Sequence, residues 1–317
     1  MNSEILKGEA LNQRKNTKVS KSVSINQKKL KSAGLFALFV GPALLAFSVI
    51  VLIPFVIGIY YAFTDWNGVT GDIHWVGLDN FKYLFTEDTQ FHQSFWLTVK
   101  YTAVAIILTN LVGFGLALLV TQMLKTRNIL RTVFFMPNLI GGLLLGFVWQ
   151  FIFIKGFASI GQLTGLSFFQ LPWLGDAQTG FWGIVIVSVW QGAGYIMVIY
   201  TAALQNVPQE VLEAAKIDGA NKWQILRHIT LPMVAPAVTI CLFLTISSSF
   251  KIFDVNLSLT NGGPFKSTEM LAFNIYTEAF VNNRYGLGEA KALIFFLVVA
   301  AITTIQVMYT KKKEVES

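Results

Sequence analysis

Six stretches of the chain lack charged side chains over a length that can cross a lipid bilayer. A bilayer core about 30 Å thick is crossed by about 20 residues of α-helix. The six stretches are Ser32–Thr64, Tyr101–Leu124, Thr132–Ile154, Ala177–Gln209, His228–Phe250 and Ala292–Thr310. Since only helices and closed barrels satisfy the backbone inside lipid, the pattern predicts an all-α membrane protein built as a six-helix bundle.

A seventh uncharged stretch, Gly156–Gly175, has the composition of a loop. Gly, Gln, Thr and Ser recur along it, and Pro172 lies near its end. Such residues weaken a helix and favour turns. We therefore expect this segment to be a loop that dips toward the membrane interface.

The basic residues indicate how the helices are oriented. Eight Lys and Arg residues precede the first stretch and three lie in each of the segments 125–131, 216–227 and 311–313, so that 17 of the 24 fall on one side of an alternating topology. Cytoplasmic loops carry such an excess. We expect both termini in the cytoplasm. The domains expected are a basic, disordered tail over residues 1–32, a six-span membrane domain over residues 33–313 and a short end over residues 314–317.

The composition supports a membrane protein and excludes other classes. Apolar residues make up 54% of the chain and charged residues 13%, with a mean hydropathy of +0.58. Soluble domains are about one quarter charged. The sequence pI of about 9.4 then reflects orientation signals in the loops, and we expect no nucleic-acid partner.

Candidate catalytic chemistry is sparse. The chain has one cysteine, Cys241, and three histidines at unrelated spacings, which gives no pattern for a disulfide framework or a metal site. It has no GxxxxGK[ST] phosphate loop, no HExxH and no GxSxG. We therefore expect no catalytic residue, no cofactor and no metal, in a protein that is not an enzyme.

The loop between the fourth and fifth stretches, residues 206–232, predicts a compact hairpin of two short helices. Asn206 can cap the first helix, and Asp218-Gly219 predicts a sharp turn. Apolar residues then recur at helical spacing as far as Pro232. A second interpretation of this loop is an amphipathic helix that lies on lipid.

The spacing within this loop resembles the EAA loop of binding-protein-dependent ABC importer permeases. The matching residues are Glu213, Ala214, Ala215, Gly219, Ile229, Leu231 and Pro232. The stretches Trp75–Phe81 (WVGLDNF) and Leu259–Pro264 (LTNGGP) are similar to those of carbohydrate permeases of the maltose and glycerol-phosphate type. The resemblance covers nearly the whole chain beyond the tail, and it is stronger to the first member of the usual permease pair.

This resemblance implies the permease subunit of an ABC importer for a sugar or oligosaccharide, a multi-pass protein of the bacterial inner membrane. Its partners would be a second permease subunit, an ABC ATPase dimer that hydrolyses the ATP, and an extracytoplasmic solute-binding protein, besides the sugar and membrane lipid. The hairpin would then be a coupling helix seated in a cleft of the ATPase. Glu213 would be a polar contact, Ala214 and Ala215 would permit close approach, and Gly219 would form the turn.

Polar residues inside the predicted spans are candidates for the path of the substrate, because polar groups that face lipid are costly. One helix face in the fifth span collects residues at i, i+3, i+4 and i+7, namely Thr245, Ser248, Ser249 and Ile252. The resemblance implies that this face contacts the sugar together with residues of the fourth span, Gln191, Gly192 and Tyr195. Ile252 stands where the family example has an amide, which implies a different hydrogen-bond pattern. The alternative for all these small or polar residues is helix packing.

Four other polar residues are expected to serve the structure. Lys251 and Asp254 lie close enough in sequence to pair with each other. Asn110 and Gln150 are expected to form hydrogen bonds between helices.

Three further interpretations stay open from the sequence: a permease of the glycerol-phosphate type, an ion or solute channel, and a membrane-embedded enzyme. A phosphorylated substrate would require Arg or clustered cations near mid-membrane, whereas the predicted spans offer only Lys251. A channel would gate without an ATPase partner.

The predicted topology can be tested with single cysteines in a Cys241→Ala background. Cysteines at Thr17 and Asn221 should resist an impermeant thiol reagent in intact cells, because both fall on the basic, cytoplasmic side. A cysteine at Thr89 should react. Labelling at Asn221 from outside would contradict the six-span topology.

Overall fold

The computed structural model describes Phe36, residues 38–122 and residues 125–311. The predicted tail over residues 1–32 and the end over residues 314–317 lie outside this part of the chain. The chain divides into two compact units between Tyr60 and Tyr61, and each unit is described by itself.

The described residues of the first unit form one long helix. Helical residues extend from Leu38 to Tyr61 and include a π-helical turn, η1 (Ser48–Leu52), followed by α2 (Ile53–Tyr61). Large apolar side chains along it, such as Phe39 and Ile50, are exposed. A surface of this kind requires an apolar environment, as lipid provides.

The second unit is built from four longer helices and a set of shorter ones. The longer helices are α4 (Thr89–Thr121), α9 (Ala177–Gln205), α13 (Ala235–Phe250) and α15 (Tyr285–Lys311). The shorter helices are α3 (Asp79–Thr86), α5 (Arg127–Phe135), α6 (Gly142–Phe151), α7 (Phe157–Thr164), α8 (Ser167–Gln170), α10 (Gln209–Ile217), α11 (Lys222–Ile225), α12 (Leu231–Met233) and α14 (Leu271–Tyr276).

Short turns of other helical types link these elements. They are the 3₁₀ turn η2 (Met136–Leu139) and the π-helical turns η3 (Ile152–Gly156), η4 (Leu226–Thr230), η5 (Asn256–Thr260) and η6 (Thr277–Val281). Within the described residues, the only β pairing is an isolated antiparallel bridge between Thr64 and Trp75.

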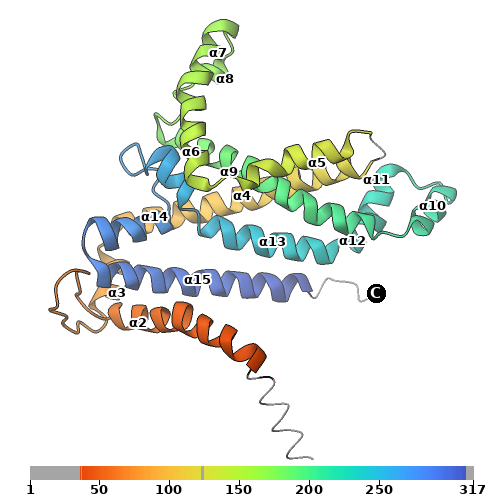
Figure 1. The fold of residues 1–317 in the computed structure, drawn as a ribbon. Coiled ribbons are helices and arrows are strands. Elements are labelled where there is room, and N and C mark those ends of the chain that lie inside the picture. The colour runs from red at the N-terminus through yellow and green to blue at the C-terminus, as the bar shows by residue number, and fades with distance from the viewer. Residues whose placement is uncertain (1–35, 37, 123–124, 312–317) are drawn as a thin grey trace, which may run out of the picture. The chain divides into compact units, whose positions relative to one another are not determined.

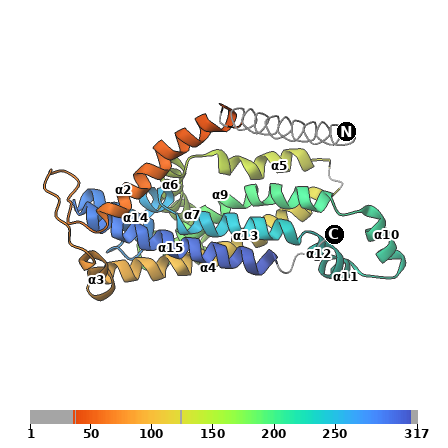
Figure 2. The same ribbon diagram turned by 90° about the horizontal axis from the view of Figure 1, so that it is seen from below.

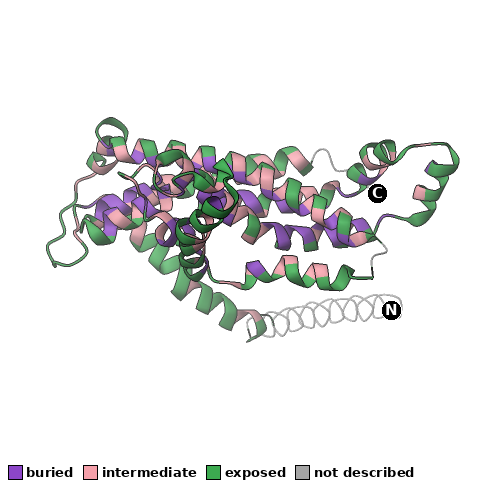
Figure 3. Cartoon of the chain, turned by 90° about the horizontal axis from the view of Figure 1, so that it is seen from above, coloured by how far each residue is buried: buried purple, intermediate pink, exposed green. Residues whose placement is uncertain are grey.

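The four longer helices run side by side (Figure 1). α4 packs against α9 and α13, and α13 packs against α15. Seen from below, α10 and α11 lie at one end of these helices, and α3 and α14 lie at the other end (Figure 2). Figure 3 shows that buried residues gather where the helices meet, whereas outward faces and the α10–α11 end are exposed. Exposed apolar faces on long helices are expected where lipid is the solvent.

Two glycines allow neighbouring helices to approach closely. Gly113 of α4 lies against Ile196 of α9, and Gly194 of α9 lies against the backbone carbonyl of Phe134 in α5. Small residues at such contacts let membrane helices pack backbone to backbone. The contacts fix α9 between α4 and α5.

Two longer helices begin at aspartate caps. Asp88 accepts a hydrogen bond from the amide of Phe91 at 2.8 Å, and Asp176 accepts those of Gln178 and Thr179 at 2.8 and 2.9 Å. The Thr179 amide, followed by that of Gln178, lowers the pKa of the Asp176 carboxyl. These caps satisfy amides that a helix start leaves unpaired.

Two helices extend past charged residues at which the sequence predicted them to begin, because each charged side chain has a partner inside the protein. α4 begins at Thr89 rather than at the predicted Tyr101, and Lys100 lies 4.8 Å from the centre of the Phe181 ring. A cation over an aromatic face is stabilised there. α15 likewise begins at Tyr285, ahead of the predicted Ala292, because Lys291 is paired inside the protein.

The predicted third span, Thr132–Ile154, is wrong in its bounds. α5 ends at Phe135, Pro137 lies in η2, and a new helix begins at Gly142. Proline has no amide N–H for the helix ladder and favours this break.

The loop expected over residues 156–175 is also wrong in its first half, and α8 (Ser167–Gln170) adds one helical turn in its second half. The helix that begins at Gly142 continues through α6, η3 and α7 to Thr164. Its polar side chains bond back to helix carbonyls, Ser159 to Lys155 at 3.0 Å and Thr164 to Ile160 at 2.8 Å, which hides them from an apolar environment. Gly165, with φ +72°, then ends the helix.

The fifth span is bent. Lys222–Met233 and Ala235–Phe250 meet at an angle of 70°. Pro232 and Pro236 flank the bend, where each proline removes one backbone donor. Within the described residues, five helices are long and apolar enough to cross a membrane, or six when this bent pair is counted as one span. The predicted helical membrane fold is confirmed at this level.

The close approach at Gly194 can be tested by Gly194→Ala. A Cβ at this position would collide with the Phe134 carbonyl, and overpacking of this kind costs about 1–3 kcal/mol. We expect a lower thermal unfolding temperature in detergent. The matched control is Gly115→Ala, since a Cβ at Gly115 of α4 meets nothing within 4 Å. Equal stability of the two variants would contradict the packing described here.

Candidate substrate pathway and coupling hairpin

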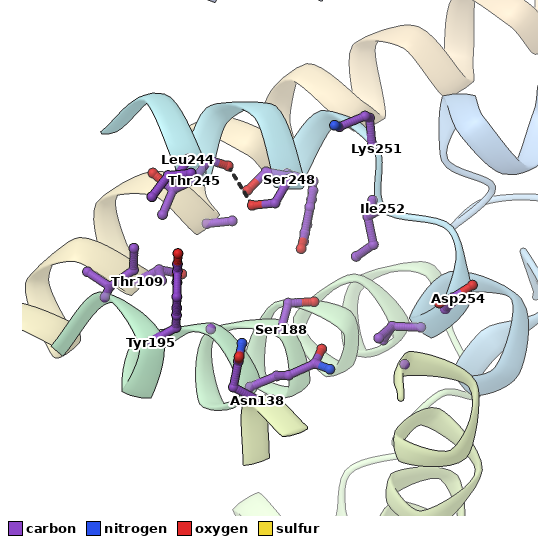
Figure 4. Close-up of a pocket in the computed structure, with 18 of the residues that line it drawn as sticks. Thr109, Asn138, Ser188, Tyr195, Leu244, Thr245, Ser248, Lys251, Ile252 and Asp254 are labelled. Carbon is purple, nitrogen blue, oxygen red and sulfur yellow. Dashed lines mark hydrogen bonds between the residues drawn. The ribbon is translucent and has the colours of Figure 1, made fainter. Parts of the chain in front are cut away.

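A cavity of 470 Å³ lies between α4, α9 and α13. It is lined by all seven residues that the sequence singled out for the substrate path: Gln191, Gly192, Tyr195, Thr245, Ser248, Ser249 and Ile252. Figure 4 shows Thr245, Ser248 and Ile252 facing Tyr195 and Ser188 across it. The tertiary structure therefore brings together two helix faces that are far apart in the sequence.

Two interruptions of the helices border this cavity. One is η2, which places Asn138 on the wall, and the other is the non-helical segment 251–253 after α13. Non-helical backbone at membrane depth is tolerated where it is buried or lines a cavity. The carbonyl of Ile140, next to the first interruption, accepts a hydrogen bond from Gln191 Nε2 at 3.0 Å. The Gln191 side chain, which was predicted to line the substrate path, thus also stabilises the helix break by this hydrogen bond.

The face on α13 has both structural and unpaired hydroxyls. Thr245 donates to the carbonyl of Cys241 at 2.8 Å and accepts from Asn110 Nδ2 at 3.0 Å. Ser248 donates to the carbonyl of Thr245 at 3.2 Å. Ser249 makes no hydrogen bond with the described part of the chain, so its hydroxyl is free for a ligand.

Asn110 and Gln150 form the hydrogen bonds between helices that the sequence predicted. Asn110 of α4 bonds Thr245 of α13 and accepts from the Tyr200 hydroxyl of α9 at 2.9 Å. Gln150 of α6 donates to the carbonyl of Leu259 at 3.2 Å. Both predictions are confirmed.

Sequence reasoning missed several residues on the cavity wall. Ser188 precedes Gln191, Gly192 and Tyr195 on α9 by three, four and seven positions, so the same helical repeat would have identified it. Asn138 had no such signal, because it lies in a break that the hydrophobic pattern did not predict. Tyr101 and Thr109 add an aromatic ring and a hydroxyl from α4.

The expected pairing of Lys251 with Asp254 is wrong. Both line the cavity, but no ion pair joins them among the described residues. Figure 4 shows the Lys251 ammonium pointing away from Asp254. The reason is that α13 ends at Phe250, so that the two side chains do not share a helix face. Asp254 instead packs against Gly142 at the start of α6.

The predicted hairpin over residues 206–232 is formed by α10, α11, η4 and α12. Glu213 and Ala214 are exposed on α10, whereas Ala215 is buried. Gly219 forms the turn with φ +82°, a conformation that glycine adopts without steric cost. The amide of Ala220 bonds the carbonyl of Ala215 at 2.9 Å, which closes the end of α10.

Two details of the hairpin differ from the expectation or add to it. Asn206 does not cap α10: it follows the last turn of α9, and Pro208 precedes α10. Proline suits this position because its missing N–H would have no partner there. Ile217 on α10 is 86% exposed, an apolar side chain at the tip that the sequence analysis did not single out.

Among the described residues, no group of His, Cys, Asp and Glu is arranged to hold a metal ion. The cavity has hydroxyls, amides and aromatic rings as its main polar features. Such an arrangement binds and orients a polar solute, and it presents no nucleophile activated by a neighbouring base.

The comparisons with known proteins agree with the helical membrane fold. Residues 109–314 match the family described as "Binding-protein-dependent transport system inner membrane component". The "Probable starch degradation products transport system permease protein AmyD" of Thermoanaerobacterium thermosulfurigenes is 48% identical over 289 residues, which cover 91% of this chain and 98% of the relative. The multiple sugar-binding transport system permease protein MsmF of Streptococcus mutans is 31% identical, over 83% of this chain and 90% of the relative.

A solved structure has the same fold. It is a bacterial ABC transporter involved in the import of the acidic polysaccharide alginate, and one of its chains matches with a TM-score of 0.79 at 20% identity, over 90% of this chain and 98% of that one. The family match and the two relatives confirm the resemblance stated from the sequence, together with a permease role, a membrane location and a function other than catalysis. This chain belongs to the family of inner membrane components of binding-protein-dependent transport systems and is a multi-pass permease subunit of an ABC importer, in which a separate subunit hydrolyses ATP.

Proposed function

We propose that this permease carries a neutral sugar or oligosaccharide into the cell through the cavity between α4, α9 and α13. One observation carries the proposal. The two helix faces that the sequence assigned to the substrate path line the same cavity. The names of the relatives support the class of cargo, since the relative with 48% identity is a permease for starch degradation products. An oligosaccharide of glucose is the corresponding candidate.

The chemistry of the cavity suits a neutral sugar. Sugars offer hydroxyl groups and apolar ring faces, which short hydroxyl side chains and aromatic rings can bind. Ser249 supplies a free hydroxyl, and Tyr195 and Tyr101 supply rings. Among the described residues Lys251 is the only cation on the wall, and Asp254 lies on the same wall. A phosphorylated substrate of the glycerol-phosphate type would favour clustered Arg or Lys side chains.

The partners follow from the same proposal. The hairpin of α10 and α11 would dock into the ATPase, with Glu213 as a polar contact and Ala214 and Ala215 allowing close approach. The exposed Ile217 would bury its side chain in that contact. Both termini would lie on this cytoplasmic side. A second permease subunit would complete the transport path, and an extracytoplasmic binding protein would deliver the sugar at the opposite end.

Two other functions, a channel and a membrane-embedded enzyme, differ from a permease because neither requires an ATPase partner. An ion or solute channel would conduct without ATP hydrolysis, and a membrane-embedded enzyme would need a catalytic pair on the cavity wall. The hairpin favours the permease over both, because its sequence resembles the EAA loop by which permeases contact an ATPase, and Glu213 and Ala214 are exposed for such a contact.

The substrate path is tested by Ser249→Leu and Tyr195→Leu. Each variant removes a polar group or a ring from the cavity wall. We expect uptake of the neutral sugar to fall by about tenfold, the factor for one lost hydrogen bond of ordinary strength. Basal ATPase activity and assembly should be preserved. Uptake is measured with labelled maltose and maltotriose in cells that express the complete transporter.

Matched variants separate a contact from a packing effect. Ser159→Leu changes an exposed serine on α7 that does not line the cavity, and it should transport normally. Tyr195→Phe keeps the ring and should lose less than Tyr195→Leu. If both leucine variants transport normally and Lys251→Ala abolishes uptake with rescue by Arg, the substrate is anionic and the neutral-sugar proposal fails.

The coupling role is tested by Gly219→Val and Glu213→Lys. The φ of +82° at Gly219 costs a β-branched residue about 1–2 kcal/mol, although a Cβ there meets nothing within 4 Å. We expect Gly219→Val to insert but to lose uptake and stimulated ATPase activity. Gly219→Asn is the control, because Asn tolerates the left-handed region. Wild-type transport by Gly219→Val and Glu213→Lys would argue against coupling through this hairpin.

A further inference from the structure

A buried lysine lies at the end of the bundle opposite the hairpin. Lys291 of α15 is 0% exposed. Its ammonium lies 2.8 Å from Asp88 Oδ2 and 2.6 Å from Glu278 Oε2, and it donates to Asn274 Oδ1 at 2.9 Å. The ammonium thus donates hydrogen bonds to Asn274 and Glu278 and forms an ion pair with Asp88. The cap of α4, the helix α14 and the turn η6 are thereby joined to α15.

The cluster is balanced in charge. Glu278 also accepts from Arg284, whose Nε lies 2.6 Å and whose Nη2 lies 2.5 Å from Oε1. Two carboxylates and two cations therefore share the site, and three of these four side chains, Lys291, Asp88 and Glu278, are buried. Burial of a charge is costly unless it is paired and hydrogen-bonded. Each of these four charged groups lies beside a group of opposite charge, which makes the arrangement specific in geometry.

A chain of hydrogen bonds leads from Lys291 toward the cavity. Asn274 donates through Nδ2 to Glu269 Oε1 at 2.6 Å. The next amide along the chain, that of Met270, donates to Asn256 Oδ1 at 2.9 Å. Asn256 is 0% exposed and donates in turn to the carbonyl of Thr268 at 2.7 Å. The segment from Thr268 to Asn274 is thus held by Asn256 at one end and by Lys291 at the other.

Asn256 stands directly beside the cavity wall. It begins η5, and the residues before it, Ile252 to Val255, line the cavity. Lys291, Asp88 and Glu278 do not line that cavity. The segment 251–253 is outside any helix, so its position depends on its contacts with other elements. The Phe253 ring packs against Phe273 and Tyr276 of α14, at 6.1 and 5.2 Å between ring centres. Beyond the segment, Asn256 is fixed by its hydrogen bonds.

We propose that Lys291 is a positioning residue for transport. Through Asn274, Glu269 and Asn256 it holds the 252–255 wall of the cavity in register with the ends of α4, α14 and α15. The proposal rests on the proposed function, in which the cavity is the path of the sugar. It adds that the charge cluster of Lys291, Asp88, Glu278 and Arg284 sets the position of the 252–255 wall and does not affect the wall on α9.

The test measures wall position directly and needs no sugar. The test uses the complete transporter in a Cys241→Ala background. One single cysteine replaces Asp254, which lies on the 252–255 wall, and another replaces Tyr195, which lies on the α9 wall. Both positions are exposed. The rate of reaction with a small, water-soluble methanethiosulfonate reagent is measured with and without Lys291→Gln. We expect a change of about tenfold or more at Asp254, because a hydrogen bond to a charged group is worth more than the ordinary one that corresponds to about tenfold, and no change at Tyr195.

A charge-balanced variant separates positioning from mere stability. In Lys291→Gln with Asp88→Asn, Glu278 keeps Arg284, and Asn still caps α4. This variant should restore the amount of inserted protein while the reaction rate at Asp254 stays changed and uptake stays low. Rates at Asp254 like those of the unaltered transporter in both variants would overturn the proposal, as would equal changes at Asp254 and Tyr195. Since no sugar is present, failure here leaves the proposed substrate path to be judged by its own uptake test.

Discussion

Lipid offers the backbone no hydrogen-bond partner, and this constraint governs the membrane-spanning part of the chain. Each backbone N–H and C=O there must be satisfied within the protein, so the uncharged stretches become helices. The helices break where the protein itself can receive the freed groups. At the break after Pro137 the Ile140 carbonyl is bonded by Gln191, and the second break, over residues 251–253, also borders the cavity. The places where the helical ladder stops therefore mark the candidate path.

Polar side chains inside the bundle divide into two groups with different uses. Asn110 donates to Thr245 and accepts from Tyr200, and these two bonds hold α4, α9 and α13 together. Their hydrogen-bonding capacity is largely consumed, as expected where an unpaired polar group is costly. Ser249 and Tyr195 stay open toward the cavity. A polar residue in a membrane helix thus becomes a candidate for ligand binding only after its structural partners are known.

The two ends of the bundle are chemically different, and the longer helices connect them. At one end, the hairpin exposes Glu213, Ala214 and Ile217; at the other, Lys291 is buried among carboxylates. Helices with a complete hydrogen-bond ladder transmit displacement as rigid rods, whereas non-helical segments such as 251–253 absorb it. This arrangement suits a permease in which movement at the hairpin is to reach a cavity wall. In our proposals the exposed hairpin binds the ATPase and the buried cluster positions the cavity wall.

The sequence by itself determined the features that depend on local chemistry. Charge-free length predicted the membrane helices, and the Asp218-Gly219 turn with the apolar repeat that follows it predicted the hairpin. The helical repeat of Thr245, Ser248 and Ser249 predicted one face of the cavity. Only the tertiary structure decided what depends on distant partners. It split the third span at Pro137, extended helix over residues 157–164, separated Lys251 from Asp254 and buried Lys291. The physical reason is that a break, an ion pair or a buried charge is stable only with groups supplied by other helices, and the pattern along one helix does not contain them.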